Sequence, residues 1–407
     1  MPHPVQHEGY GGQIMSHFAP PNFSFWLVFY EIFCYIVLTN RMKILNFGKK
    51  SWSHTLVLLG LVTLLVHFSG FDGAPYTFVA LVALIANVFA SVHHADGVAH
   101  YIGEPLGSIV LAIAVTIIEV GLIVSLMFVD GVGPSALARD TVFSGVMILI
   151  NGVVGACLFV GSLKYGEQSF SVYGIGSALS TLAAILILTL VFPNYTLTTP
   201  GPTYSTGQLT FIALVSTILY GTFLLVQNVR HRNYFVVDGE DEKNHNRQPL
   251  KVFLTSLVFL SLSLLVVVIV GKSLSPDIKH VVYKLNLPQS LVGVVIAMIT
   301  LLPETISALK AGAKNHIQKS LNLATGSALA SIGLSIPVVA LISLSKGTPL
   351  VLGLDPKESV LLLLSIFVAS LSLGHGKTTI LQGVVHLVIF AVYLFMTAFP
   401  SDRQKSW

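Results

Sequence analysis

The chain has 407 residues, of which 54% are hydrophobic and only 10% are charged. A soluble protein of this length needs a more charged surface, and successive runs of about twenty apolar residues are each long enough to cross a bilayer. The formal charge of +4 is spread between those runs, so it does not indicate nucleic-acid binding. We therefore expect an all-α polytopic membrane protein whose surroundings are the lipid bilayer and which has no nucleic-acid partner.

Residues 1–50 form an N-terminal extension whose role the sequence leaves open. Residues 22–39 are apolar enough for a short span but include Glu31. They could be an extra helix, an uncleaved signal-like segment, or sequence upstream of the native start. Met42 begins MKILNFGKK, which is typical of an N-terminus, so whether residues 1–41 belong to the native protein stays undecided.

Eleven membrane spans follow, and they predict the organisation of the rest of the chain. We place them at about 54–69, 76–92, 107–128, 141–162, 173–192, 207–227, 251–271, 290–311, 321–343, 358–374 and 379–398. The longest polar break comes after the sixth span. This predicts a leading helix (51–75), a first half (76–229), a cytosolic polar loop (230–250), a second half (251–398) and a short tail (399–407).

Each half contains five spans, and this odd number has a consequence for topology. Two five-span halves joined by one cytosolic loop must enter the membrane from opposite faces. We therefore expect two inverted five-helix repeats after the leading helix. Most Lys and Arg residues fall in the segments that become cytoplasmic if the leading helix starts inside, so the positive-inside rule gives the same orientation.

The eighth span reads LVGVVIAMITLLPETISALKA and carries Glu304 near its middle, directly after Pro303. A carboxylate at that depth costs about 2.5–3.5 kcal/mol or more, and such residues usually mark an ion or proton path. Because the proline removes a backbone donor, we expect the helix to be bent or broken beside the acid.

The third span, LGSIVLAIAVTIIEVGLIVS, places Glu119 at the position that corresponds to Glu304. Each acid lies about 18 Å or more from the start of its span, at 1.5 Å per residue, so both should reach the middle of the membrane. No Lys or Arg occurs mid-span in the clear segments to pair with them. Two facing carboxylates can hold a cation or be neutralised by protons, and this competition is the minimum that antiport requires.

Polar residues on the helices that follow each acid are further candidates. Ser327 and Ser331 lie in LNLATGSALASIGLSIP, and Asn151 lies in MILINGVVGA, the corresponding helix of the first half. We include these three side chains with Glu119 and Glu304 as predicted ion- or proton-binding residues. The alternative is that they serve helix packing, since small and hydroxyl residues let membrane helices approach closely.

A cluster of histidines and acids follows the second span in SVHHADGVAHYIGEP. It contains His93, His94, Asp96, His100 and Glu104, and a helix would place four of them, His93, Asp96, His100 and Glu104, on one stripe because they are three or four residues apart. Helix-end pairing, a pH sensor or cation entrance, and a metal-enzyme centre are the three interpretations. The HExxH pattern of a zinc hydrolase is missing.

The two cysteines, Cys34 and Cys157, lie in apolar segments without metal-binding spacing, and we expect them to be packing residues. The sequence has no Walker-type phosphate loop. We therefore expect neither ATP nor a prosthetic group; the transported cation and protons would be the protein's small partners.

Three blocks of the sequence resemble a known family. HHADGVAHYIGEPLGSIVLAIAVTIIEVGLIVSLM, RDTVFSGVMILINGVVG and LLPETISALKAGAKNHIQKSLNLATGSALASIGLSIPVVAL look like the ChaA-type bacterial proton antiporters of the calcium/cation antiporter superfamily. The resemblance covers about residues 54–398. It implies eleven spans in two inverted repeats and exchange of Ca²⁺, Na⁺ or K⁺ for H⁺, with Glu119 and Glu304 as the repeat acids. The chain departs from the wider superfamily in having AVTIIE and TLLPE where Gly-Asn precedes the acid.

These features lead to one expectation and two alternatives. We expect a secondary antiporter of the cytoplasmic (inner) membrane, not an enzyme, that exchanges cytoplasmic Ca²⁺, Na⁺ or K⁺ for protons by alternating access. The alternatives are a membrane-embedded metalloenzyme that uses the His93–Glu104 cluster and an uncoupled cation channel. Cation preference, stoichiometry and oligomeric state depend on geometry that the sequence does not supply.

Overall fold

The computed structural model describes residues 52–70, 73–103, 106–127, 136–235, 249–284 and 287–399. Residues 1–49 form one unit and residues 50–407 another, and every described residue belongs to the second. The proposed extra N-terminal helix, most of the polar loop after the sixth span, and Glu104 therefore lie outside the described residues.

The described chain is almost entirely helical. In order, the helices are α2 (Trp52–Phe68), α3 (Ala74–Ile102), α4 (Leu106–Met127), α5 (Leu137–Met147), η1 (Ile148–Val153), α6 (Val154–Tyr165), α7 (Val172–Leu186), η2 (Ile187–Val191), η3 (Phe192–Tyr195), α8 (Thr206–Leu225), η4 (Val226–Arg230), η5 (Arg232–Tyr234), α9 (Leu250–Lys284), α10 (Ser290–Gly312), α11 (Ile317–Lys346), α12 (Pro356–Leu373) and α13 (Ile380–Ala398). Here η1, η2 and η4 are π-helical and η3 and η5 are 3₁₀. The strands β1 (Gln168–Ser169) and β2 (Lys377–Thr378) pair antiparallel.

The predicted all-α class and number of spans are confirmed in the part of the chain that the structure describes. Helices α5 and α6 form one rod through η1, so eleven helical rods follow one another, one for each predicted span. Nine of the described helices are long and apolar enough to cross a membrane by length and composition, and Trp52–Phe68 and Ile109–Ser125 are shorter apolar helices. The chain is a multi-pass membrane protein.

Two helices continue well past their predicted ends. Helix α3 runs to Ile102 rather than 92, and α9 runs to Lys284 rather than 271. The extended part of α9 is held to the start of α3 by polar contacts: Thr77 donates to Asp277 at 2.7 Å, and the Tyr76 and Ser273 hydroxyls lie 3.2 Å apart. Hydropathy predicts only where an apolar run ends, and α9 continues beyond that point because its polar residues contact α3.

The sequence predicts a bend or a break at Pro303, and the structure has no break there. Helix α10 is continuous from Ser290 to Gly312, with Pro303 inside it and buried. A proline removes a single hydrogen bond of the helix ladder, and in a buried membrane helix the packing of its neighbours can maintain the helical path. Glu304 therefore projects from an intact helix.

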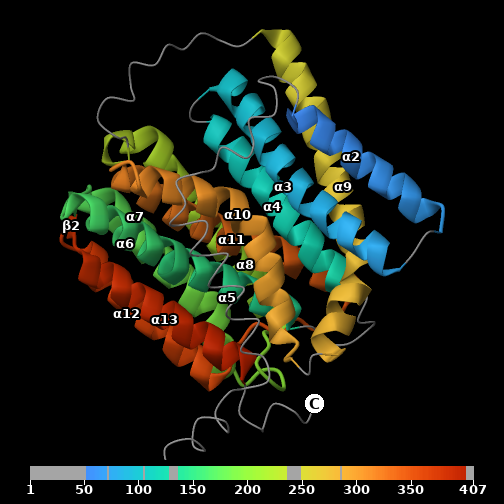
Figure 1. Cartoon of the computed structure of the whole chain (residues 1–407). Helices are drawn as coiled ribbons and strands as arrows, with labels where there is room; N and C mark the ends of the chain where they lie inside the picture. Colours follow the sequence, from blue (N-terminus) through green and yellow to red (C-terminus); the bar gives the residue numbers. More distant parts are fainter. Residues whose placement is uncertain are drawn as a thin grey trace, which may run out of the picture. The chain divides into compact units, whose positions relative to one another are not determined.

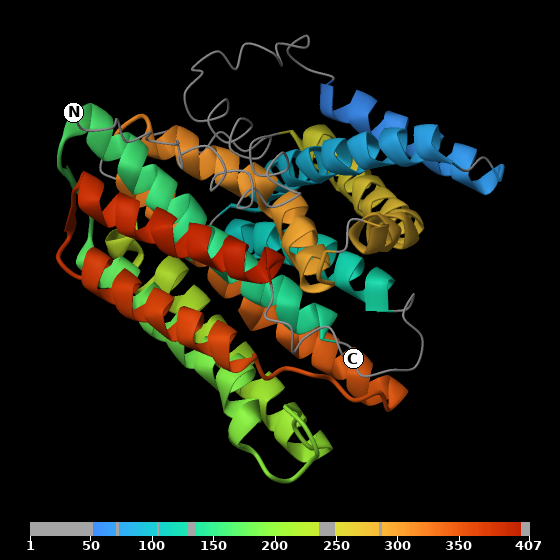
Figure 2. The same ribbon diagram turned by 60° about the horizontal axis from the view of Figure 1, so that its bottom comes forward.

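The helix contacts occur in reciprocal pairs. Helix α4 packs against α11 while α10 packs against α5, and α8 packs against α11 while α13 packs against α6. Helices α3 and α9, the first of each predicted half, make the most extensive contact with each other. Reciprocal contacts of this kind are what two repeats related by a two-fold axis would make. Figures 1 and 2 show α2, α3 and α9 together on one side, and α12 and α13 side by side on another.

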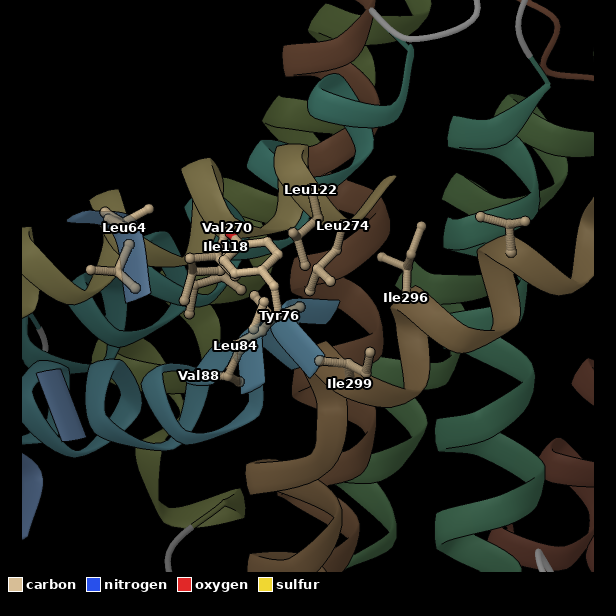
Figure 3. Close-up of a cluster of buried hydrophobic side chains, with 14 of the residues drawn as sticks. Leu64, Tyr76, Leu84, Val88, Ile118, Leu122, Val270, Leu274, Ile296 and Ile299 are labelled. Carbon is tan, nitrogen blue, oxygen red and sulfur yellow. The ribbon is translucent and has the colours of Figure 1, made fainter. Parts of the chain in front are cut away.

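An apolar cluster connects the helices that carry the two acids (Figure 3). It brings together Leu64 of α2, Leu84 of α3, Ile118 of α4, Val270 of α9 and Ile296 of α10, all of them buried. Because Ile118 directly precedes Glu119, this cluster fixes α4 beside its acid. The α3–α9 pair thus provides a rigid support for α4 and for the first part of α10.

Candidate ion-binding site

The structure brings the two predicted acids together. Glu119 on α4 and Glu304 on α10 have only 4% and 6% of their surfaces exposed. Their carboxyl groups are close enough to interact electrostatically, although they are 185 positions apart in the sequence. Two buried acids in each other's field cannot both remain ionised without a compensating positive charge.

Glu119 has a hydrogen-bond donor. The Ser331 hydroxyl of α11 donates to Glu119 Oε1 at 2.5 Å, whereas the Ser335 hydroxyl, one turn further along α11, has no hydrogen-bond partner among the described residues. Both serines are buried. The contact crosses from the first predicted half to the second, so the acid of one half is held by the helix that follows the acid of the other.

Glu304 differs from Glu119 in having an unsatisfied oxygen. Its Oε2 atom is buried and has no hydrogen-bond partner among the described residues. Burying a charged oxygen without a hydrogen-bond donor costs at least as much free energy as losing a hydrogen bond to a charged group. Native proteins therefore rarely contain such an oxygen. This oxygen therefore requires a proton or a cation, and the charged group that acts on it is the like-charged Glu119.

Close helix packing brings α5 beside the same pair of acids. A Cβ atom built on Gly145 would stand 3.5 Å from Ser331 Oγ and 3.6 Å from Leu301 Cδ1. A Cβ on Gly293 would stand 2.9 Å from the backbone of Asp140, so α5 and α10 nearly touch through their main chains. Small residues make this approach feasible, as in other membrane helix contacts.

Two threonines that the sequence analysis did not single out stand one turn before the acids. Thr116 Oγ1 donates to the Ala112 carbonyl, and Thr300 Oγ1 donates to the carbonyls of α10 one turn back. Both side chains are buried. A hydroxyl three or four residues before each acid was visible in AVTIIE and TLLPE, but a threonine bonded to its own helix is so common in membrane spans that the pattern is not specific.

Asn151 lies in a different polar cluster. Its amide Nδ2 donates to Ser365 Oγ of α12 at 2.9 Å, and its Oδ1 is 3.2 Å from His386 Nδ1 of α13. The Ser365 hydroxyl itself donates to the Leu361 carbonyl at 2.7 Å, so it can only accept from Asn151. The amide NH₂ must then face Ser365, and Oδ1 must accept from the Nδ1–H of His386.

Both polar ends of the Asn151 side chain are therefore engaged by α12 and α13 rather than by the acids. Ser327 is half-buried and makes no hydrogen bond to either acid in the described ranges. Ser331 thus has a contact with the acid pair, whereas ion binding by Asn151 and Ser327 stays a prediction from the sequence.

His93, Asp96 and His100 lie on the continuous helix α3 with the spacing of the predicted stripe, and Glu104 lies outside the described residues. The Asp96 Oδ2 and His100 Nε2 atoms are 3.6 Å apart at the surface, and His94, which is not part of the stripe, is buried. Within the described ranges no three His, Cys, Asp or Glu side chains are placed to hold a metal ion. The described part of the cluster therefore offers no set of three metal ligands for the metalloenzyme alternative.

Comparisons with known proteins agree on the family. The family model described as sodium/calcium exchanger protein matches residues 73–229 and 255–399. The chain is 43% identical over 372 residues to a candidate ionic transporter, y4hA, of Sinorhizobium fredii, covering 89% of this chain and 100% of that protein. It is 37% identical over 325 residues to the sodium-potassium/proton antiporter ChaA of Escherichia coli, covering 79% of this chain and 87% of the relative.

Solved structures show the same fold. The H⁺/Ca²⁺ exchanger CAX superposes with a TM-score of 0.66 at 15% identity, covering 87% of this chain and 89% of that chain. Native YfkE superposes with a TM-score of 0.65 at 18% identity, covering 85% and 99%. The eleven helical rods therefore have the arrangement of a cation exchanger, and the chain belongs to the sodium/calcium exchanger protein family.

Proposed function

We propose that this protein is a secondary antiporter that exchanges a cytoplasmic cation for protons. The observation that carries the proposal is the buried, unpartnered Oε2 of Glu304 in the field of a second buried acid, Glu119. One cation can satisfy both carboxylates, and protons can neutralise them, but the two cannot do so at once. Occupancy that alternates in this way couples the two fluxes.

Glu119, Glu304 and Ser331 are the residues we assign to this exchange. Ser331 supports Glu119 with a hydrogen bond, while Glu304 supplies the free oxygen. Relatives are named for exchange of sodium and potassium and of calcium with protons, so Na⁺, K⁺ and Ca²⁺ are the cations to test. No prosthetic group has a role in this mechanism.

The cytoplasmic (inner) membrane is the location we propose. The support is the distribution of Lys and Arg, which favours a cytoplasmic start of α2, and the bacterial origin of the two similar relatives. Inward movement of protons down their gradient would then drive the cation out of the cell.

Everted membrane vesicles test the proposal. A ΔpH is established by respiration, and Na⁺, K⁺ and Ca²⁺ are added in turn across a range of pH. We expect at least one cation to dissipate ΔpH in vesicles that contain the wild type and none to do so with Glu304→Gln. Glu167→Gln is the matched control, because Glu167 is exposed and only pairs with Lys377 at 3.6 Å. Cation flux that proceeds without any change in ΔpH would instead support an uncoupled channel.

A further inference from the structure

The leading helix α2 meets α3 and α9 through aromatic and imidazole rings rather than through aliphatic side chains alone. The ring centroids of His54 on α2 and His94 on α3 are 5.2 Å apart, and those of His93 and His94 are 5.6 Å apart. Phe259 of α9 contacts His54 at 4.2 Å and His94 at 5.4 Å, and Trp52 contacts His93 at 4.9 Å. We call His54, His93 and His94 the imidazole cluster.

This cluster differs from the stripe expected from the sequence. His54, which lies forty residues before His94, joins it, while Asp96 and His100 pair with each other at the surface. His94 is 3% exposed, and its Nε2 atom is buried without a hydrogen-bond partner among the described residues. A buried imidazole nitrogen without a partner is an unfilled site for a proton or another donor.

Few charges are available to compensate a proton here. The groups whose charges act on His93 and His94 are His54, the two histidines themselves and Asp96, which acts on His93. The elements packed against α3 at this point contribute Trp52 from α2 and Phe259 from α9, neither of which is charged. His93 is exposed and tolerates a first proton beside Asp96, whereas a second proton on the buried His94 would place two like-charged rings with centroids 5.6 Å apart.

We propose that the imidazole cluster is a second proton-binding site, separate from the acid pair, and that its protonation loosens α2 from α3 and α9 and slows exchange. This inference rests on the proposed function. Helix α3 leads directly into α4, which carries Glu119, and α4 packs on both α3 and α9. A change in the contact of α2 with that pair therefore reaches the support of one of the two acids.

The direction of exchange explains how protonation of the imidazole cluster could regulate transport. The start of α2, the end of α3 and the start of α9 share one end of the bundle, and the Lys and Arg distribution assigns that end to the cytoplasm. An exchanger that admits protons acidifies the cytoplasm, so a proton site on that face would limit its own activity. Histidine is the side chain whose charge changes over the relevant pH range.

Fluorescence of Trp52 tests the site without transport. In the full-length protein, Trp26→Phe and Trp407→Phe leave Trp52 as the sole indole, and its emission is titrated between pH 8 and pH 5. Protonation of His93 should quench Trp52. His54→Gln removes an imidazole whose charge disfavours protonation of His93, so the midpoint should move upward by on the order of half a pH unit or more. His67→Gln, on the same helix but stacked on Tyr76, should leave the midpoint unchanged. Equal midpoints for His54→Gln and His67→Gln would overturn the proposal.

Transport provides the second readout. Exchange in proteoliposomes is measured with the pH of the cytoplasmic face varied from 8 to 6 and the other face held constant. As the pH falls from 8 to 6, we expect the exchange rates of the wild type and of His67→Gln to decrease several-fold more than that of the double variant His54→Gln/His94→Gln. Superimposable profiles would refute inhibition by the cluster. If the double variant does not insert, His54→Phe, which preserves a ring against Phe259, replaces it.

The two proposals fail in distinguishable ways. If the wild type carries no cation in exchange for protons at any pH, the proposed function fails, while the Trp52 titration still decides whether the cluster binds protons. If exchange is present and Glu304→Gln abolishes it but the histidine variants change neither readout, only the inference about the imidazole cluster fails.

Discussion

Glu119 and Glu304 occupy corresponding helices of the two halves, yet their surroundings differ. Glu119 accepts a hydrogen bond of 2.5 Å from Ser331. Glu304 has a buried oxygen with no partner among the described residues. The first-half helix that corresponds to α11 carries Asn151, but this amide is committed to Ser365 and His386.

This difference indicates unequal roles for the two acids. Glu119 keeps a donor whether or not a cation is present, so its position is set by the protein. Glu304 reaches a satisfied state only by gaining a proton or a cation. We therefore expect Glu304 to be the acid at which proton and cation replace one another, with Glu119 as the fixed second ligand.

The largest expected effect comes from neutralising each acid. Glu304→Gln and Glu119→Gln should each reduce exchange by about 100-fold or more, because neither variant can bind a cation through two carboxylates. Their stabilities should differ. At alkaline pH and without added cation, Glu304→Gln removes an unpaired buried charge and should be more stable than the wild type by about 1–3 kcal/mol, whereas Glu119→Gln should not.

Thermal unfolding in detergent, with vesicle transport alongside it, measures both effects. Glu167→Gln should match the wild type in each assay, since its partner Lys377 is on the surface. Equal stabilisation by the two neutralised variants would remove the asymmetry on which the assignment of roles depends.

Ser331→Ala should make the two acids more alike. When the Ser331 hydroxyl is removed, Glu119 also has a buried oxygen without a hydrogen-bond donor. The KM for the cation should then rise by roughly 10-fold, which corresponds to about 1.4 kcal/mol for a hydrogen bond to a charged group. Ser327→Ala, four residues earlier on α11, is the matched control and should change KM by less than about two-fold. A larger effect for Ser327→Ala would restore that residue as a ligand and move the site along α11.

The close approach of α5 and α10 should be sensitive to a single methyl group. Gly293→Ala would place its Cβ 2.9 Å from the Asp140 backbone, which cannot rotate away, so we expect a loss of about 1–3 kcal/mol from overpacking. Gly176→Ala on α7, where nothing lies within 4 Å of the added atom, should be nearly neutral. A fully stable Gly293→Ala protein would mean that the backbones of α5 and α10 can separate at this contact without loss of stability.

The smallest effect should come from the Asn151 cluster. Ser365→Ala removes the acceptor of the Asn151 amide and should cost about 1 kcal/mol of stability, with little change in cation KM. If KM instead rises as much as in Ser331→Ala, then Asn151 acts on the cation and the two halves are more symmetric than their hydrogen bonds indicate. Flux and melting measurements on the same preparation separate these outcomes.

Hydropathy was sufficient to predict the helical class and the eleven rods, because each span is a run of about twenty consecutive apolar residues that can be recognised without knowing its tertiary contacts. The joint burial of Glu119 and Glu304 was also predictable, since lone acids in apolar runs have few alternatives. The ends of the helices could not be predicted from hydropathy. The end of α9 is held by contacts such as Asp277 with Thr77, 200 positions away, and the end of α3 by the stacking of Tyr101 on Phe253.

Side-chain partners within the site were harder to predict. Ser331, Ser327 and Asn151 look equally suitable in the sequence, and only packing shows that Ser331 alone donates to an acid. The same reason explains the histidines. A helical stripe predicts which residues share a face of α3, but it cannot show that His54 of another helix completes the cluster.

Proton release on cation binding is the most direct test of the central claim. Purified protein in weakly buffered detergent at alkaline pH receives Na⁺, K⁺ or Ca²⁺, and the change in pH is recorded by a soluble indicator. The competition between proton and cation at the acid pair predicts proton release with at least one of these cations, and none from Glu304→Gln. Cation binding by the wild type without proton release, or undiminished release from Glu304→Gln, would contradict it.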